Sequence, residues 1–381
     1  MPLKLRILLS AVLRKLKKIT DKQHDDYGIR PKVLFLSPSQ GIFENKQVNY
    51  RHLSFVDSSL EPTQWQLVAR KKLAELVGYQ AKRPLVETIL TKNFVQFDSS
   101  FSRSKSYLRV NSCSDVPVTI VKPESTKSRR KPVLIFLAGS TSGVHVGWGE
   151  VRVPIDHDRV SCGSDILLRA AHDGYFGVGV EQAGFGERQE KHLHKKSSSR
   201  TADAFCHLVM QGRSLLGLGA TEVSSVIDWL VDNANEFEID IKKIYVYGHS
   251  SGGTLAQYCA ALDPRIAGIV ASGSVGYFKN TITKRGVASG LSVVPGILNW
   301  FEASDLISLI APRSFIAVSG VNDHIFPYKG AKSVVDEATL FYEKLGAAHK
   351  ISALEADGEH RYYGQHSWEY FKSNVLKSSP T

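Results

Sequence analysis

The sequence predicts an α/β protein whose central, mostly parallel sheet is covered by helices on both faces. From residue 133 onward, short continuous apolar runs alternate with longer segments of helical periodicity, a pattern typical of a buried parallel sheet. Within this region the apolar run 243–247 ends abruptly in Gly-His-Ser-Ser-Gly (248–252), and the following residues read as a helix. The sequence therefore also predicts a strand, a tight turn and a helix, with Ser250 at the apex of the turn.

The remaining elements follow in the order that such a sheet requires. A helix over 61–77 precedes antiparallel strands, and a short insertion at 277–309 follows a strand end, where open α/β sheets build substrate pockets. The other predicted strands are 94–97, 106–110, 116–121, 133–137, 175–180, 266–271, 314–318 and 349–355, and the other predicted helices are 166–173, 214–233, 329–345 and 367–376.

The first 60 residues differ from the rest of the chain. We predict a basic amphipathic helix and a connecting arm over 1–60, followed by a catalytic domain over 61–381. Between residues 4 and 19, leucine, valine and isoleucine share one helical face and lysine and arginine the other. Such a helix over 1–20 docks on the protein's own body or on a second subunit of a homo-oligomer, or lies on a membrane surface. No segment reaches the roughly 18 uninterrupted apolar residues that span a bilayer.

Charge and cysteine usage narrow the function classes. The net charge is +11 over 381 residues, but the basic residues form separate clusters without interleaved aromatics, which disfavours nucleic-acid binding. Attraction to an anionic membrane or an acidic glycan stays open. The pair His192 and His194 lacks a neighbouring carboxylate, so we predict no metal site and no cofactor. Scattered cysteines are typical of reduced thiols and of a cytoplasmic protein, and they are Cys113, Cys162, Cys206 and Cys259.

A serine nucleophile requires a base, and the base requires an orienting carboxylate. Asp323 follows the predicted strand 314–318, and His360 follows the strand 349–355. Ser250, Asp323 and His360 thus come at successive strand ends, in the chain order that accompanies a serine at such a turn. Each of the last two, taken alone, is also typical of an ordinary turn residue.

An oxyanion hole is expected beside the serine. The backbone N–H of Ser251 is one predicted donor, and the N–H of Ser140, in the small-residue loop 138–143, is the second. Aromatic side chains that could line the acyl or sugar pocket are Trp148, Tyr277, Phe278, Phe301, Phe326 and Tyr363.

Several motifs extend well beyond the serine turn. They are the segments 174–188, 212–217, 248–254, 261–266, 310–314, 322–327 and 358–362. On these residues, from about position 65 to the C-terminus, the chain resembles the α/β-hydrolases, specifically the acetyl xylan esterase and dienelactone-hydrolase-like branch. The resemblance implies Ser250 as nucleophile, Asp323 as acid and His360 as base. One departure is Ala138-Gly139, where the family usually has His-Gly, so a supporting histidine side chain is missing.

The function expected from these features is that of a serine hydrolase working through an acyl-enzyme. A carboxylic-ester hydrolase that removes a small acyl group such as acetyl, from a small molecule or a glycan, fits best. A serine peptidase of the prolyl-oligopeptidase type shares the fold and is the first alternative. That family also carries a propeller domain, however, and only about 60 residues precede the hydrolase region here. A non-catalytic binding protein is the second alternative. The acyl group and its acceptor stay open.

Overall fold

The computed structural model describes residues 51–93, 100–111, 114–124, 130–190, 201–283 and 290–375. The chain divides into two compact units, residues 1–47 and 48–381, and all described residues belong to the second. The predicted helix within 1–20, the predicted strand 94–97 and the pair His192 and His194 lie outside the described residues. The predictions for these segments stay predictions.

Within the described residues, nine strands form one sheet in the order β1-β2-β3-β5-β4-β6-β7-β8-β9. The first three strands and β5 pair antiparallel, whereas β5, β4, β6, β7, β8 and β9 run parallel. The strands are β1 (Glu87–Asn93), β2 (Phe101–Asn111), β3 (Ser114–Pro123), β4 (Lys131–Leu137), β5 (Phe176–Val180), β6 (Ile239–His249), β7 (Ile266–Ser272), β8 (Ser314–Gly320) and β9 (Ile351–Ala356). The parallel part therefore matches the predicted sheet.

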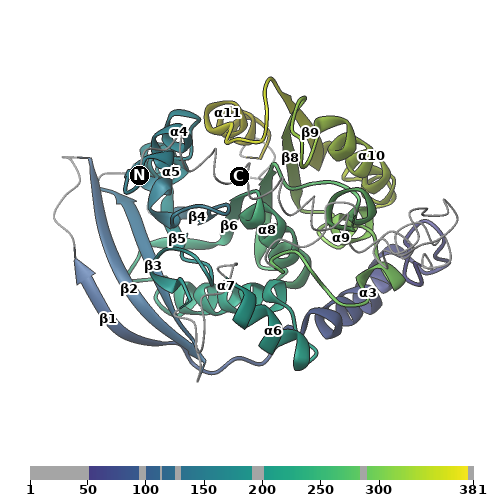
Figure 1. The fold of residues 1–381 in the computed structure, drawn as a ribbon, viewed down its shortest axis with the longest axis horizontal. Coiled ribbons are helices and arrows are strands. Elements are labelled where there is room, and N and C mark those ends of the chain that lie inside the picture. The colour runs from purple at the N-terminus through teal and green to yellow at the C-terminus, as the bar shows by residue number, and fades with distance from the viewer. Residues whose placement is uncertain are drawn as a thin grey trace, which may run out of the picture. The chain divides into compact units, whose positions relative to one another are not determined.

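Helices cover both faces of this sheet (Figure 1). One core cluster joins the sheet to α3, α7, α8, α9 and α10, and a second joins its other face to α5 and α11. Ser214, whose hydroxyl accepts a hydrogen bond from the Gly217 N–H at 3.0 Å, caps the N-terminus of α7. The described helices are α3 (Pro62–Val77), α4 (Ile155–Ser161), α5 (Ile166–His172), α6 (Ala202–Met210), α7 (Leu215–Asp232), α8 (Ser251–Leu262), α9 (Ala303–Ser308), α10 (Tyr328–Lys344) and α11 (Gly364–Val375).

Some elements were not predicted. Strand β1 is exposed along its whole length, so its sequence carries no apolar alternation that would mark it as a strand. Helices α4, α6 and α9 are six to nine residues long, too short for a clear helical period. Helix α9 lies in the 277–309 insertion, which separates β7 from β8 as predicted.

Residues 51–60, which the sequence assigns to a connecting arm, pack within the second unit. Phe55 is 2% exposed, and its ring makes edge-on contacts with Trp65 and Phe341. Arg51 forms ion pairs with Asp305 at 2.7 Å and with Glu337 at 2.9 Å. This segment therefore contributes to the core.

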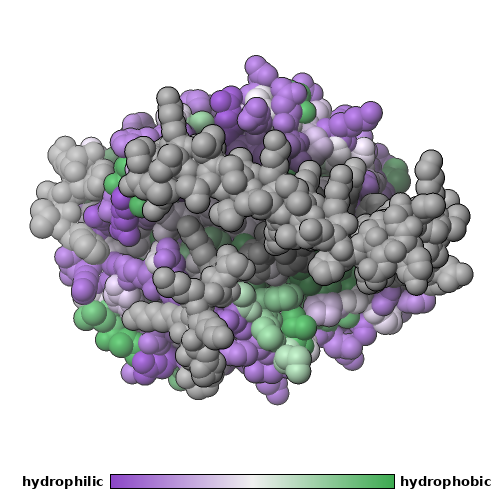
Figure 2. All heavy atoms as spheres, viewed as in Figure 1, coloured by the Kyte–Doolittle hydropathy of each residue, from purple (hydrophilic) through white to green (hydrophobic). Residues whose placement is uncertain are grey.

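The surface seen in Figure 2 is mostly hydrophilic, with apolar side chains gathered over α6, which carries the exposed Met210. In the described part of the chain, no helix by itself has the length and apolarity needed to cross a bilayer. Among the helices that the structure describes, α6 and α7 meet that requirement only as a pair, and they are bent by 95° relative to each other.

Candidate active site

Ser250 occupies a strained turn between β6 and α8. Its φ of 52° and ψ of −120° lie outside the regions that residues with a side chain normally adopt. The flanking glycines make the turn sterically feasible. A Cβ on Gly248 would lie 2.2 Å from the carbonyl oxygen of Gly252, and a Cβ on Gly252 would lie 2.1 Å from that of Leu137. The turn thus has the geometry predicted from the sequence.

His360 lies between Ser250 and Asp323. Its Nε2 is 2.9 Å from Ser250 Oγ, and its Nδ1 is 2.7 Å from Asp323 Oδ2. The structure therefore brings together the three residues that the sequence analysis selected, from three different strand ends. With Nδ1–H donating to the carboxylate, Nε2 is free to accept the serine proton.

Asp323 is held as a carboxylate. Its Oδ1 accepts hydrogen bonds from the N–H groups of Ile325 at 2.7 Å and Phe326 at 2.8 Å. Burial raises the pKa of Asp323, but the hydrogen bonds from His360 and the Phe326 and Ile325 amides outweigh it, so that the pKa lies below its ordinary value. Asp323 therefore stays ionised at neutral pH and can orient the imidazole.

Two other histidines and an aspartate near the C-terminus lie apart from the hydrogen-bonded series of Ser250, His360 and Asp323. His366 Nε2 is 3.0 Å from the Glu355 carbonyl oxygen, on an exposed part of α11. His349 lies in a short 3-10 helix, Ala348–Lys350, before the last strand. Asp357 is exposed, whereas Asp323 is 2% exposed and contacts His360 directly.

Ser251 and Ser140 lie beside the nucleophile. Both line the same cavity as Ser250, and the Ser140 hydroxyl donates a hydrogen bond to Ser251 Oγ at 3.2 Å. Ser251 begins α8, so its N–H has no acceptor inside the helix and lies at the positive end of the helix dipole. Both residues thus lie at the nucleophile, and their role as oxyanion donors stays a prediction.

The loop that carries Ser140 has supports that the sequence analysis missed. The Gly139 N–H donates to Tyr362 Oη at 3.2 Å, and Gln182 Nε2 donates to the Ala138 carbonyl oxygen at 2.5 Å. These contacts hold the backbone of Ala138 and Gly139, the two residues that stand where the family usually has His-Gly. Gln182 and Tyr362 lie within the motifs 174–188 and 358–362, but no local pattern shows that they meet this loop, because they are distant from it in sequence.

His249 is a further residue that the sequence analysis passed over. It is 5% exposed, and its ring lies 4.0 Å from that of Tyr362 and 5.3 Å from that of His360, centroid to centroid. Burial, followed by the proximity of His360, lowers the pKa of His249 to about 3, so the ring is neutral. It packs behind the candidate base without competing for its proton. Its position in the sequence, directly before Ser250, could have indicated that it lies in the site.

A cavity of about 560 Å³ opens at Ser250. The insertion between β7 and β8 contributes Thr281, Ile282 and the segment 290–293 to its wall. Ile155, Arg159, Ile325 and Arg361 also line the cavity, so its wall is largely apolar with a few charges.

The aromatic prediction for this cavity was largely wrong. Phe326 lines it, but the other five predicted residues do not. Phe278 and Phe301 are buried in one core cluster, and Trp148 and Tyr363 in the other. The Tyr277 hydroxyl donates to Glu337 Oε2 at 2.6 Å, away from the serine. Large aromatic side chains gain most from complete burial, so residue type alone does not separate core from pocket.

Comparisons with known proteins agree with this fold. The family described as BD-FAE matches residues 218–331. The chain is 27% identical over 299 residues to YtaP of Bacillus subtilis (strain 168), a provisionally assigned hydrolase, and the match covers 76% of this chain and 92% of that protein.

Solved structures of three esterases superpose on most of the chain. A provisionally assigned acetyl xylan esterase from Bacteroides fragilis has a TM-score of 0.66 and 18% identity, covering 91% of this chain and 92% of its own. A promiscuous CE15 esterase from a marine bacterial metagenome has a TM-score of 0.63 and 15% identity, and the match covers 88% of this chain and 99% of that one. A glucuronoyl esterase from Solibacter usitatus has a TM-score of 0.60 and 13% identity, and the match covers 83% of this chain and 94% of that one. These similarities confirm the predicted α/β-hydrolase fold.

Proposed function

We propose that this α/β-hydrolase-fold chain is a serine hydrolase that cleaves carboxylic esters through an acyl-enzyme. The observation that carries the proposal is the position of His360, with one ring nitrogen 2.9 Å from Ser250 Oγ and the other 2.7 Å from Asp323 Oδ2. A hydroxyl, an imidazole and a buried carboxylate in this arrangement are the parts needed for nucleophilic acyl transfer.

In the first half-reaction, Ser250 Oγ attacks the ester carbonyl carbon while His360 Nε2 takes the hydroxyl proton. The carbonyl oxygen becomes an oxyanion, which the N–H groups of Ser251 and Ser140 are placed to stabilise. Collapse of this intermediate breaks the bond to the alcohol oxygen, and His360 returns the proton to that oxygen. The products are the free alcohol and an acyl group esterified to Ser250.

In the second half-reaction, water replaces the alcohol. His360 Nε2 accepts a proton from the water as its oxygen attacks the acyl carbon, and the same oxyanion donors act again. The proton then passes to Ser250 Oγ, the acid is released, and the serine is restored. Asp323 keeps its charge throughout and stabilises the imidazolium that forms in each half-reaction.

The proposed substrate is an ester of a small acyl group, such as acetyl, on a glycan or another polar acceptor. Three of the superposed structures are described as an acetyl xylan esterase, a CE15 esterase and a glucuronoyl esterase, which supports an ester over an amide. The cavity also fits this reading, because apolar Ile282, Ile325 and Phe326 can contact an acyl chain while charged side chains lie at its wall.

A hydrolysis screen tests the proposal. Acetyl, propionyl and octanoyl 4-nitrophenyl esters, acetylated xylo-oligosaccharides, a methyl glucuronate ester and a peptide anilide are compared at equal enzyme concentration. We expect ester cleavage that is lost in Ser250→Ala, with kcat/KM higher for acetyl and propionyl than for octanoyl esters. Faster cleavage of the anilide would contradict the ester assignment. A rate that rises with chain length would contradict the small acyl group.

A further inference from the structure

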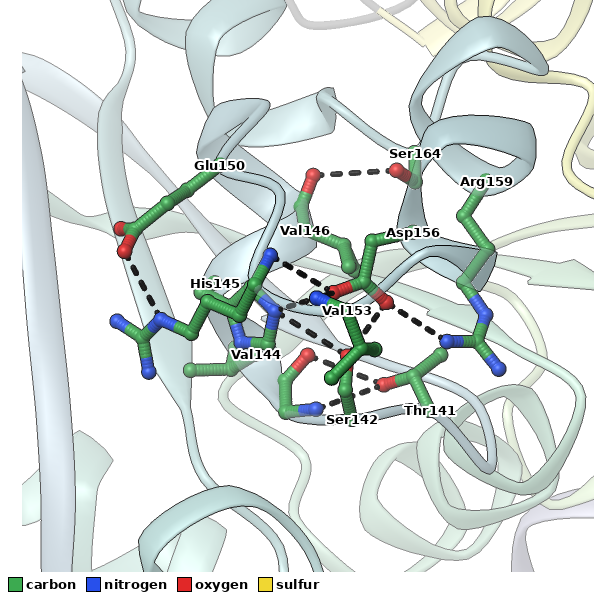
Figure 3. A network of polar contacts seen from close by, with 12 residues as sticks. Thr141, Ser142, Val144, His145, Val146, Glu150, Val153, Asp156, Arg159 and Ser164 are labelled. Atoms are coloured by element: carbon green, nitrogen blue, oxygen red, sulfur yellow. Dashed lines mark hydrogen bonds and ion pairs between the residues drawn. The ribbon is translucent and has the colours of Figure 1, made fainter. Parts of the chain in front are cut away.

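A buried polar network lies behind the loop that carries Ser140, and its centre is Asp156 (Figure 3). The Asp156 side chain, on α4, is fully buried. It accepts hydrogen bonds from Ser142 Oγ at 2.5 Å, His145 Nε2 at 2.9 Å and Arg159 Nη1 at 2.8 Å. The N–H groups of Arg152 and Val153 donate to the same carboxylate at 3.1 and 3.2 Å.

Burial and hydrogen bonding determine which groups in this network are charged. Burial lowers the pKa of His145, so that the imidazole is neutral and donates from Nε2. Although burial raises the pKa of Asp156, the hydrogen bonds from Ser142 and His145 lower it overall, and the group remains a carboxylate. Arg159 therefore supplies the compensating positive charge. A buried carboxylate with this many donors holds its partners firmly, because each donor that is lost weakens the stabilisation of a charge held in a low dielectric.

Three of these partners connect Asp156 to the active site or to the loop beside it. Ser142 lies two residues after Ser140, in the loop between β4 and the 3-10 helix Val144–Trp148, and His145 lies in that helix. Arg159 lines the cavity that holds Ser250. Asp156 itself does not line the cavity, so it can act on the reaction only through these neighbours.

We propose that Asp156 is a positioning residue for ester hydrolysis, which anchors the loop 139–143 so that the Ser140 N–H faces the oxyanion. This inference rests on the proposed function of the same site. The loop has little regular structure of its own, and the hydrogen bond from Ser142 is its shortest link to a buried charge. Oxyanion donors act only when they are fixed at the place where charge develops. Loosening this anchor therefore reduces stabilisation of the transition state more than binding of the substrate.

The experiment compares Asp156→Asn and Ser142→Ala with Asp165→Asn as the matched control. Asp165 also forms an ion pair with an arginine of its own helical segment, Arg169 at 2.9 Å, but it does not line the cavity. We expect Asp156→Asn to lower kcat about 10- to 100-fold, with KM changed less than about threefold, since complete loss of an oxyanion donor costs about 10² to 10³. Asp165→Asn should retain wild-type kcat.

A double-mutant cycle separates positioning from general destabilisation. If Asp156 acts through Ser142, the variant with both substitutions has nearly the same kcat as Asp156→Asn alone, because both remove the same link. Multiplied losses in the double variant would overturn the inference. Ser142→Ala removes a single hydroxyl, so it supplies a folded protein for the kcat comparison even if Asp156→Asn does not fold.

The rate of covalent labelling by a fluorophosphonate gives a readout independent of the substrate. The phosphoryl oxygen occupies the oxyanion site, so we expect labelling of Ser250 to slow at least tenfold in Asp156→Asn. Equal labelling rates, with ester hydrolysis intact in the wild type, would overturn the inference but not the proposed function. Slower labelling of Asp156→Asn, in a protein that cleaves none of the esters, would support the anchoring of the loop 139–143 by Asp156 while contradicting the proposed ester substrate.

Discussion

The backbone N–H of Gly139 donates a hydrogen bond to the hydroxyl of Tyr362, which lies 223 positions further along the chain. The contact joins the loop that carries Ser140 to the loop that carries His360. Tyr362 is 3% exposed, so this contact is buried. Two parts of the candidate active site are thus held together by one buried tyrosine.

This contact predicts the effect of Tyr362→Phe. The substitution leaves the Gly139 N–H buried without an acceptor, and that costs about 1–3 kcal/mol unless the loop moves. We expect the loop to move and kcat to fall about tenfold, measured with 4-nitrophenyl acetate. Tyr342→Phe is the control, because it removes a buried hydroxyl that donates to the Arg313 carbonyl oxygen at 2.9 Å, outside the cavity. Equal kcat in the two variants would show that the Gly139 contact has no catalytic role.

The packing at the turn predicts a large loss of stability in Gly252→Ala. The added methyl group would lie 2.1 Å from the Leu137 carbonyl oxygen and 2.4 Å from that of Ala138, and these are backbone atoms, which cannot move aside as a flexible side chain could. We expect a loss of roughly 3 kcal/mol in the free energy of unfolding. In Gly330→Ala, on α10, the nearest atom is 3.9 Å away, so that stability should stay equal or rise slightly. Urea titration of both variants measures the difference, and similar losses would contradict the steric account.

Glu181 predicts a specific pH dependence of stability. The side chain is 5% exposed, its Oε1 accepts a hydrogen bond from the Val144 N–H at 3.0 Å, and burial raises its pKa to about 7 from an ordinary 4.5. At a pH between these two pKa values, Glu181 keeps its proton in the folded protein but has released it in the unfolded chain. Stability therefore falls as the pH rises from about 4.5 to about 7, by roughly 3 kcal/mol in total.

Glu181→Gln removes this titration while it keeps an oxygen that accepts the Val144 N–H. We expect the variant and the wild type to have similar stability at pH 5 and the variant to be the more stable at pH 8. Urea titrations across this range provide the measurement. Parallel stability curves for the two proteins would show that Glu181 is already ionised in the folded state at pH 5.

The three candidate catalytic residues could be selected from the sequence because each follows a strand. Parallel strands bring their carboxyl ends to one edge of the sheet. Chain order and strand ends were enough to place Ser250, Asp323 and His360 together. The strained turn was equally readable, since only glycine fits at positions 248 and 252.

The support of the loop 139–143 could not be predicted in the same way. It depends on Gln182 and Tyr362, whose proximity follows from the packing of the whole sheet rather than from a local pattern. Asp156 lies on a helix of seven residues, and no motif marked it. The choice of pocket aromatics was wrong for a related reason. Whether Phe301 faces a cavity or the core depends on the path of the insertion, which residue type does not determine.

The most direct test of the central claim, that His360 is the base for Ser250, is kcat/KM for 4-nitrophenyl acetate in His360→Ala and His366→Ala. The two histidines are near in sequence, but only His360 contacts the serine, whereas His366 meets a backbone carbonyl on the surface. We predict a loss of about 10⁴ or more in kcat/KM for His360→Ala and a change of less than about threefold for His366→Ala. A comparable loss in both variants, or more than about a tenth of the activity remaining in His360→Ala, would contradict the account.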